Sequence, residues 1–259
     1  MNCALFSLPV PAPRHRTLAR WTRAAIFGAV AAAALPAAHA DVTVTFDTLP
    51  VDLVAHLDYF DTHDGFYVGA FSNAANPYPG DLVGAVVDGT DAADTCYPSL
   101  QCPSRGSQYM SILNDGVLDI GRSAPNDTFR IKSFSASFLG PVDPTAPATP
   151  GLVTFLGIKQ DQSTVSQTFQ LGAAGPDGYS FANYITSGAF ASANLTEVYV
   201  YGYACNSAGS CNAFNSNKGQ FAIDDIATTA TLPVPEPSSW MMLGAGLLGL
   251  AAWTRRRSA

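Results

Sequence analysis

The sequence has few charged residues: 13% of its 259 residues are Asp, Glu, Lys or Arg, and only two are glutamates and three lysines. Because Glu and Lys favour helices, their scarcity argues against a helical bundle. Glycine (22 residues) and proline (18) are abundant between short apolar runs, which favours many strands joined by turns. With both ends set aside, roughly 190 residues remain, enough for one domain with a single core.

Familiar catalytic motifs are also missing. The sequence contains no G-x-S-x-G, no H-E-x-x-H, no phosphate-binding loop and no dinucleotide fingerprint. His56 and His63 are the only histidines beyond residue 40. Glycoside hydrolysis needs two carboxylates at a set separation, and eighteen aspartates offer too many pairs to single one out. The sequence therefore predicts a protein that is not an enzyme.

The charge is distributed unevenly along the chain. Seven of the thirteen basic residues lie in the two ends, so the segment from Asp41 to Leu232 has six basic and nineteen acidic residues, a net charge of −13. Such a surface repels nucleic acid backbones, which excludes a nucleic-acid partner. It is compatible with cations, neutral glycans or basic surfaces, or simply with a well-solvated surface.

The N-terminus has the pattern of a secretory signal peptide. Residues 1–23 are basic and contain no acid, an apolar stretch runs from Ala24 to Leu35, and Ala38-His39-Ala40 has the small-x-small form of a cleavage site. A transmembrane anchor is the alternative, but about twelve apolar residues are too few for a core that needs about 20. We expect signal peptidase to remove residues 1–40 between Ala40 and Asp41.

The C-terminus has three parts in a fixed order. Val234-Pro235-Glu236-Pro237 is held extended by its prolines, an uncharged stretch runs from Trp240 to Trp253, and the basic cluster Arg255, Arg256 and Arg257 follows. At about 1.5 Å per residue, a helix over the uncharged stretch covers about two thirds of a membrane core of about 30 Å. The arginines would hold the cytoplasmic side.

This tail, residues 233–259, resembles the PEP-CTERM sorting signal. The resemblance implies a membrane sorting enzyme of the exosortase type as partner, and transient insertion of a short C-terminal transmembrane helix into the inner membrane. It also implies a Gram-negative host that makes exopolysaccharide, and a final location at the cell surface or in the extracellular matrix. A plain C-terminal anchor after a proline linker is the alternative.

Four cysteines follow the signal peptide, in two pairs with the same short spacing. They are Cys96 with Cys102 and Cys205 with Cys211, and each pair lies in a turn-rich segment. In an oxidising compartment, two local disulfides are the simplest arrangement. A zinc site of all four thiolates is the alternative, although the spacing is longer than is usual for zinc.

Residues 41–232 show repeated strand patterns. Val42, Val44 and Phe46 alternate with threonines, and Asn114-Asp115-Gly116 has the composition of a hairpin turn. In Phe129–Phe138 the apolar parity shifts after Ile131, which predicts a β-bulge. The only helical turn expected is a short one near Val51–Leu57. The other expected strands are Phe66–Phe71, Leu82–Val87, Tyr109–Leu113, Val117–Ile120, Leu152–Lys159, Val165–Leu171, Leu195–Tyr203 and Phe221–Ile226. The pattern predicts an all-β fold: a two-sheet antiparallel β-sandwich of jelly-roll type, similar to carbohydrate-binding modules.

The last expected strand carries two adjacent carboxylates, Asp224 and Asp225, that need compensation if they are buried. The segment resembles the QFxxD motif of one PEP-CTERM subfamily, with Gln220, Phe221 and Asp224 in the named places. It also resembles the final strand of carbohydrate-binding jelly rolls in which a structural calcium bridges the first and last strands. That resemblance implies a calcium ion held by Asp47, Asp224 and Asp225. Alternatively, these carboxylates cap a turn or accept backbone N–H groups.

Two further groups are candidates for binding. Asp58, Asp61 and Asp64 with His63 could hold a metal, or form a solvated loop. Glu197 lies on the strand that carries Tyr199, Tyr201 and Tyr203, a row that could stack on sugars or serve only sheet packing.

The sequence therefore predicts an exported, non-catalytic cell-envelope or matrix protein associated with exopolysaccharide or biofilm. The alternatives are a lectin-like carbohydrate-binding module and a secreted glycan-active enzyme.

Overall fold

The computed structural model describes residues 39–62, 64–124, 127–141 and 147–231. The expected signal peptide up to residue 38 and the expected sorting tail lie outside these residues, and so does His63. Within the described part, no helix is long and apolar enough to cross a membrane.

The chain forms an antiparallel β-sandwich of jelly-roll type, and its strands fall into two layers. The first sheet contains β2 (Leu53–Ala55), β5 (Leu82–Asp88), β6 (Gln108–Ile112), β14 (Phe221–Thr231), β8 (Phe129–Phe138) and β11 (Ala182–Ile185) in that order, with β1 (His39–Val44) paired to β14. The second contains β3 (Tyr59–Asp61), β4 (Phe66–Phe71), β7 (Val117–Arg122), β12 (Leu195–Cys205), β9 (Gly151–Lys159) and β10 (Thr164–Leu171), with β13 (Cys211–Asn212) paired to β12. The layers are joined by hydrogen bonding at the pair Leu195–Phe129 between β12 and β8.

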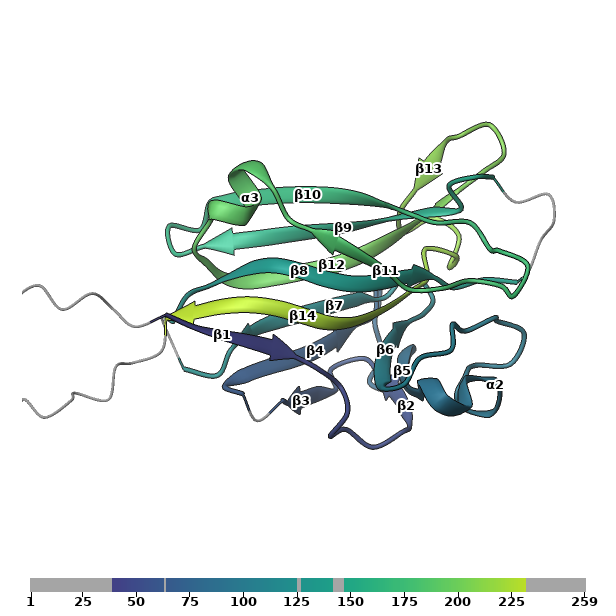
Figure 1. Ribbon diagram of the computed structural model, residues 1–259, viewed down its shortest axis with the longest axis horizontal. Helices are drawn as coiled ribbons and strands as arrows, with labels where there is room; N and C mark the ends of the chain where they lie inside the picture. Colours follow the sequence, from purple (N-terminus) through teal and green to yellow (C-terminus); the bar gives the residue numbers. More distant parts are fainter. Residues whose placement is uncertain (1–38, 63, 125–126, 142–146, 232–259) are drawn as a thin grey trace, which may run out of the picture. The chain divides into compact units, whose positions relative to one another are not determined.

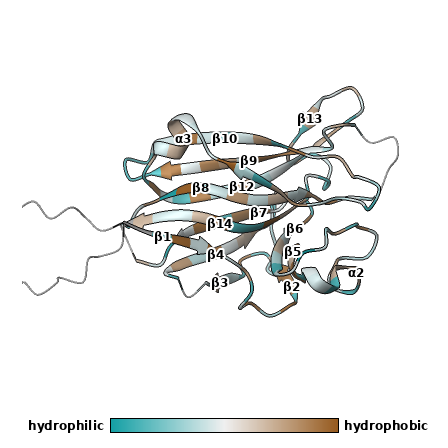
Figure 2. Ribbon diagram, in the orientation of Figure 1, coloured by the Kyte–Doolittle hydropathy of each residue, from teal (hydrophilic) through white to brown (hydrophobic). Residues whose placement is uncertain are grey.

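Aromatic side chains fill the space between the two layers. Phe66 of β4 packs edge-on against Phe129 of β8, with ring centroids 5.1 Å apart, and Phe134 of β8 packs against Phe155 of β9 at 4.3 Å. All four rings are fully buried. Figure 2 shows the hydrophobic residues gathered in the strands, with hydrophilic residues in many of the connecting loops. Burial of this shared apolar layer is the main stabilising contribution to the sandwich.

The first and last strands lie together, as the jelly-roll interpretation predicts. β1 pairs with the second half of β14 from His39–Thr231 to Val44–Ile226, and Figure 1 shows the two strands side by side. Val44 and Phe46 are buried while Thr43 is exposed, so the expected alternation is confirmed. Each of the strand runs expected from the sequence falls on a strand of the structure.

The predicted β-bulge in β8 is confirmed. The pairing of β14 with β8 shifts between Ala227–Ser133 and Thr228–Ile131, which leaves Lys132 as an extra residue. Phe129 and Ile131 before the shift and Phe134 after it therefore all face the core. β14 has a bulge of its own, because Asp224 pairs with Ser135 and Ala227 with Ser133, and Asp225 there has a positive φ of 48°.

The helical turn expected near Val51–Leu57 is wrong. Leu53–Ala55 forms the short strand β2, whose buried Val54 lies opposite Gly84 of β5. A β-branched residue on a half-buried edge favours a strand over one isolated helical turn. The helices of the described part are instead η1 (Gly89–Asp91), α2 (Ala92–Thr95) and α3 (Gly188–Ser192).

The segment from η1 to residue 107 covers part of the outer face of the first sheet, over β5, β6 and β14. Leu100 and Cys102 of this segment pack against a second apolar cluster that includes Tyr109 of β6 and Ala222 of β14. The hydroxyl of Tyr109 donates to the carbonyl of Pro103 at 2.9 Å. The first sheet is therefore covered over β5, β6 and β14, whereas the tyrosines of the second sheet are partly exposed.

Candidate functional site

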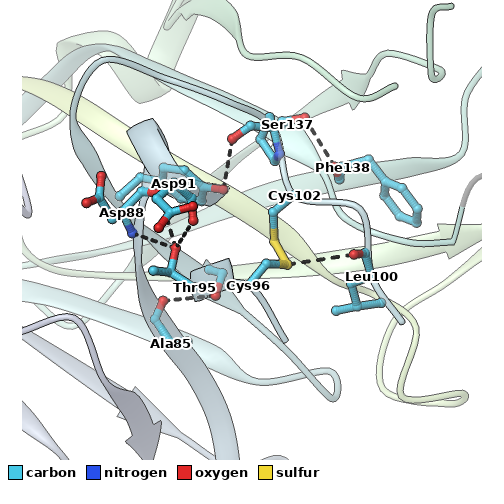
Figure 3. The surroundings of a disulfide bond; sticks show 12 residues. Ala85, Asp88, Asp91, Thr95, Cys96, Leu100, Cys102, Ser137 and Phe138 are labelled. Atoms are coloured by element: carbon cyan, nitrogen blue, oxygen red, sulfur yellow. Dashed lines mark hydrogen bonds between the residues drawn. A yellow bond between two sulfur atoms is a disulfide. The ribbon is translucent and has the colours of Figure 1, made fainter. Parts of the chain in front are cut away.

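Both expected disulfides are present. Cys96 is bonded to Cys102 in the segment that covers the first sheet, and Cys205 to Cys211 where β12 meets β13. Figure 3 shows the first disulfide after α2, where the hydroxyl of Thr95 donates to the carbonyl of Asp91 and accepts from the backbone N–H of Asp88. The zinc site of four thiolates does not form, because the four sulfur atoms are consumed in these two separate bonds.

The expected calcium ligands form an ion pair with an arginine instead. Asp224 is fully buried, and its Oδ2 lies 2.8 Å from Nε of Arg105 and accepts from the hydroxyl of Ser107 at 2.9 Å. The carboxylate of Asp225 contacts the same guanidinium. Asp47 accepts a hydrogen bond from the backbone N–H of Gln108.

These residues do not fit a calcium ion, since a guanidinium already lies against two of the three carboxylates and would repel a cation. No group of three or more His, Cys, Asp or Glu side chains suited to a metal occurs in the described ranges. Burial raises the pKa of Asp224 to about 6, as does the charge of Asp225, although hydrogen bonds and Arg105 act in the opposite direction. The calcium site stays a prediction that the described residues do not support.

Other residues singled out in the sequence have structural partners. Phe221 is buried in the core, and the side-chain amide of Gln220 donates to the carbonyl of Asn217. Asp58 accepts from the backbone N–H of Ala55 at 2.6 Å, as expected of a loop carboxylate. Ala40 and Asp41 lie within β1, paired with Ala230 and Thr229. Cleavage between them stays a prediction.

The outer face of the second sheet carries aromatic side chains from three of its strands. We call this surface the tyrosine face; it comprises Tyr59 of β3, Tyr67 and Phe71 of β4, and Tyr199, Tyr201 and Tyr203 of β12, with β7 between. The strand register explains it, because Val198 and Val200 point into the core and the alternating tyrosines therefore point outward. The expected tyrosine row is thus one side of a larger surface.

Two glycines let the rings lie close to the sheet. A Cβ atom at Gly69 would be 2.7 Å from the ring of Tyr59, and one at Gly121 would overlap the ring of Tyr67. The rings therefore lie across the backbone of neighbouring strands. On the other side, the rings of Tyr201 and Tyr203 are 5.8 Å apart, and Tyr201 packs against Phe214 at 5.0 Å.

A pair of carboxyl groups lies beneath these rings. Asp119 of β7 is opposite Tyr199 on one side and Gly69 on the other, and only 2% of it is exposed. The charge of Glu197 acts on this carboxyl group, and Oε1 of Glu197 accepts from the hydroxyl of Tyr199 at 3.0 Å. Two carboxyl groups can hydrogen-bond to each other only when one of them carries a proton.

The environment of the pair explains where that proton resides. Burial, then the charge of Glu197 and the hydrogen bond to it, raise the pKa of Asp119 to about 7. Burial also raises the pKa of Tyr67 to about 12, helped by the charges of Asp119 and Glu197. The Oδ1 atom of Asp119 is buried and has no hydrogen-bond partner among the described residues. Asp119 was not singled out in the sequence, although a carboxylate within the apolar run Val117–Ile120 was a signal for it.

The tyrosine face therefore combines flat rings, phenol hydroxyls, the partly buried carboxyl group of Glu197 and the buried one of Asp119. Ring faces stack against the C–H faces of sugars, while phenol hydroxyls exchange hydrogen bonds with sugar hydroxyls. Asp119 is covered, so it supports the surface from below and is not placed to touch a ligand.

The C-terminal tail matches a known protein family. A family model described as the PEP-CTERM protein-sorting motif matches residues 233–257. The chain carries a PEP-CTERM sorting motif. The motif implies a secreted, exosortase-processed protein that is extracellular or at the cell surface. The PEP-CTERM match includes the expected motif Val234–Pro237 and the cluster Arg255–Arg257, and membership of the QFxxD subfamily stays a prediction.

No curated protein matches the chain. Among solved structures, this chain is similar to TmCBM61 in complex with β-1,4-galactotriose, with 9% identity and a TM-score of 0.33 over 71% of this chain and 93% of that one. The CBM22-1 xylan-binding domain from Paenibacillus barcinonensis Xyn10C has 10% identity and a TM-score of 0.29, over 73% of this chain and 93% of that one. The xylan-binding module CBM15 has 14% identity and a TM-score of 0.28, over 68% and 95%.

Proposed function

We propose that the protein is a non-catalytic component of the cell surface or extracellular matrix that binds a neutral polysaccharide through its tyrosine face. The observation that carries the proposal is the tyrosine face itself, with partly exposed rings on β3, β4 and β12 and the buried carboxyl group of Asp119 beneath them. Rings of this kind, with hydroxyl groups at their edges, suit a flat and hydroxyl-rich ligand.

The negative charge of the chain favours a neutral polysaccharide over an acidic one. The chain between Asp41 and Leu232 has a net charge of −13, and Glu197 lies beneath the face itself. A glycan rich in uronic acids would be repelled, whereas a neutral chain would not. Because the sorting signal directs the protein to the cell surface or the extracellular matrix, we expect its ligand to be exopolysaccharide of the host.

The sorting route is the second part of the proposal. We expect export through a signal peptide cleaved after Ala40, transit through the inner membrane of a Gram-negative host, and processing at the Pro-Glu-Pro motif. Mass spectrometry of the protein recovered from that host would test this route, because it locates both termini. A mature chain that keeps Met1, or one that keeps Arg255–Arg257, would contradict it.

Binding is tested with the exported protein on a glycan array, followed by calorimetry. Tyr203→Ala removes one ring near the C-terminal end of β12. We expect a loss of affinity of about tenfold, because an aromatic contact is usually worth about 1–1.5 kcal/mol. Tyr97→Ala is the control, since Tyr97 is an exposed aromatic residue (43%) in the segment that covers the other sheet. Absence of any glycan binding would overturn the proposal, and so would hydrolysis of a bound glycan that is lost in Asp119→Asn.

A further inference from the structure

A pocket of about 520 Å³ lies at one end of the tyrosine face. We call it the end pocket; it is lined by Ser72, Asn73, Ala74, Asp81, Leu82, Asn114, Phe214, Asn215 and Asn217. Ser72 directly follows Phe71, the last residue of β4, and Phe214 packs against Tyr201 of β12. Phe214 therefore lines the end pocket and also extends the row of tyrosine rings that β12 carries.

The Phe214 side of the end pocket is held in place by a buried carboxylate. Asp115 is 2% exposed and accepts backbone N–H groups of Ser216, Asn217 and Gly219, at 3.1, 2.8 and 2.6 Å. These bonds fix a segment in which Phe214 and Asn217 both have positive φ, 57° and 53°. Since that backbone conformation is uncommon for residues other than glycine, the surrounding hydrogen bonds must maintain it.

The opposite side is fixed as well. The backbone N–H of Ser72 donates to Nδ1 of His56 at 3.1 Å, and the hydroxyl of Ser72 accepts from the N–H of Ala74. Asn114 donates from its side chain to the carbonyl of Leu82. The end pocket is thus formed before any ligand arrives, which lowers the cost of binding.

The lining of the end pocket suits a sugar ring. Phe214 is 40% exposed, and the side-chain amides of Asn73 and Asn215 have no hydrogen-bond partner within the described ranges. An amide provides both a donor and an acceptor, as a sugar hydroxyl requires. The volume falls in the range of about 300–1,000 Å³ that is typical of small-molecule sites. Asp81 is the one ionisable residue in the lining, and its negative charge disfavours an acidic sugar.

We propose that the end pocket is a subsite for one uncharged sugar residue of the polysaccharide that lies along the tyrosine face, with Phe214 as its stacking platform. This inference rests on the proposed function and extends it, because it adds a second place of contact. Affinity should then depend on chain length, since only an oligosaccharide long enough to reach from the face into the end pocket uses both contacts.

The test uses the exported protein and β-1,4-linked gluco-, galacto- and manno-oligosaccharides of two to six units, with trigalacturonic acid as the acidic probe. Calorimetry is run on the wild type and on Phe214→Ala, Asn215→Ala, Tyr203→Ala and Tyr97→Ala. We expect Phe214→Ala and Asn215→Ala to lower the affinity for the longest neutral ligand at least tenfold and fivefold, respectively. We expect both to flatten the dependence of affinity on length, while Tyr97→Ala changes neither quantity.

The outcomes separate the two proposals. If Tyr203→Ala loses affinity while Phe214→Ala and Asn215→Ala bind every ligand as the wild type does, the end pocket is not a subsite and the proposed function stands. If the wild type binds none of the oligosaccharides, both proposals fail. Stronger binding of trigalacturonic acid than of the neutral ligands would also overturn the subsite. If Phe214→Ala lowers the melting temperature, its loss of affinity could come from unfolding. Asn215→Ala then tests the subsite instead.

Discussion

Asp119 and Glu197 lie on the neighbouring strands β7 and β12, and burial together with the charge of Glu197 raises the pKa of the Asp119 carboxyl group. Strand pairing sets Asp119 opposite Tyr199, and the hydroxyl of Tyr199 donates to Glu197. The two carboxyl groups therefore join β12 to β7 within the sheet that carries the tyrosine face. The proton on Asp119 affects the stability of that face.

This proton makes the stability of the fold depend on pH. The pKa of Asp119 is about 7 in the folded protein and about 3.9 in an unfolded chain. Between these values the folded state binds a proton that the unfolded state has lost, so the free energy of unfolding falls as pH rises from about 4 to about 7. Asp119→Asn keeps a hydrogen-bond donor toward Glu197 and removes the charge. At pH 8 we expect it to gain about 2 kcal/mol, or roughly 4–8 °C in melting temperature.

Thermal melting of both proteins at several pH values checks this expectation. The gain should vanish near pH 3, where Asp119 is protonated in both states. Asp94→Asn, at an exposed position of α2, is the control and should give no such pH-dependent gain. Equal melting temperatures for wild type and Asp119→Asn at pH 8 would show that the pair does not share a proton.

The position of Tyr67 depends on the absence of a side chain at residue 121. Because a Cβ atom there would overlap the Tyr67 ring, Gly121→Ala should push the ring off the sheet without removing it. We expect a loss of roughly 1–3 kcal/mol in stability, the usual cost of overpacking, together with weaker glycan binding. Gly172→Ala is the matched control, since no atom lies within 4 Å of its Cβ. Unchanged denaturation and binding in Gly121→Ala would mean that the ring can move freely.

Arg105 is the cation that lets Asp224 be buried. Removing one partner of a buried ion pair leaves an uncompensated charge, so Arg105→Ala should cost roughly 3–5 kcal/mol in urea unfolding. The double variant Arg105→Ala with Asp224→Asn should recover much of that loss, because the buried charge is gone. Strict additivity of the two single effects would contradict the pairing.

We expect calcium not to change the melting temperature of the wild type through Asp47, Asp224 and Asp225. The guanidinium of Arg105 contacts both Asp224 and Asp225, and Asp47 is engaged with a backbone N–H group. We therefore expect the same melting temperature with excess calcium and with a chelator. A calcium-dependent rise that disappears in Asp224→Ala would restore the predicted site.

The strands could be predicted from the sequence because apolar alternation determines which residues face the core. That pattern located the β8 bulge after Ile131, whereas the contact of the first and last strands was predicted from the resemblance to jelly rolls. It could not locate Arg105, which lies in a segment without alternation between α2 and β6 and reaches Asp224 across 119 positions of sequence.

The proximity of Asp119 to Glu197 could not be predicted from the sequence for a related reason. Glu197 and the tyrosines of β12 follow one another in sequence, but Asp119 joins them only through the pairing of β7 with β12. The order of strands in a sheet depends on non-local packing, which a single sequence does not display. The end pocket likewise combines residues that follow β4, β6 and β13.

The two disulfides close loops of equal length in different surroundings. Each joins cysteines six positions apart, so the chain-entropy contribution is about 2 kcal/mol for either one. Cys102 also packs against the apolar cluster around Tyr109, whereas Cys211 lies in an exposed hairpin. We expect the double substitution of Cys96 and Cys102 by alanine to cost about 1 kcal/mol more than that of Cys205 and Cys211, since the first also loosens packing.

Urea unfolding of both double variants measures the difference, and limited proteolysis locates its origin. The loss of the first disulfide should open cleavage sites between residues 89 and 107 and expose Tyr109, whose hydroxyl contacts Pro103. The loss of the second should leave that segment resistant, because the hairpin of β12 and β13 belongs to the other sheet. Equal unfolding free energies with equal protection of residues 89–107 would show that the first disulfide acts on the unfolded chain alone.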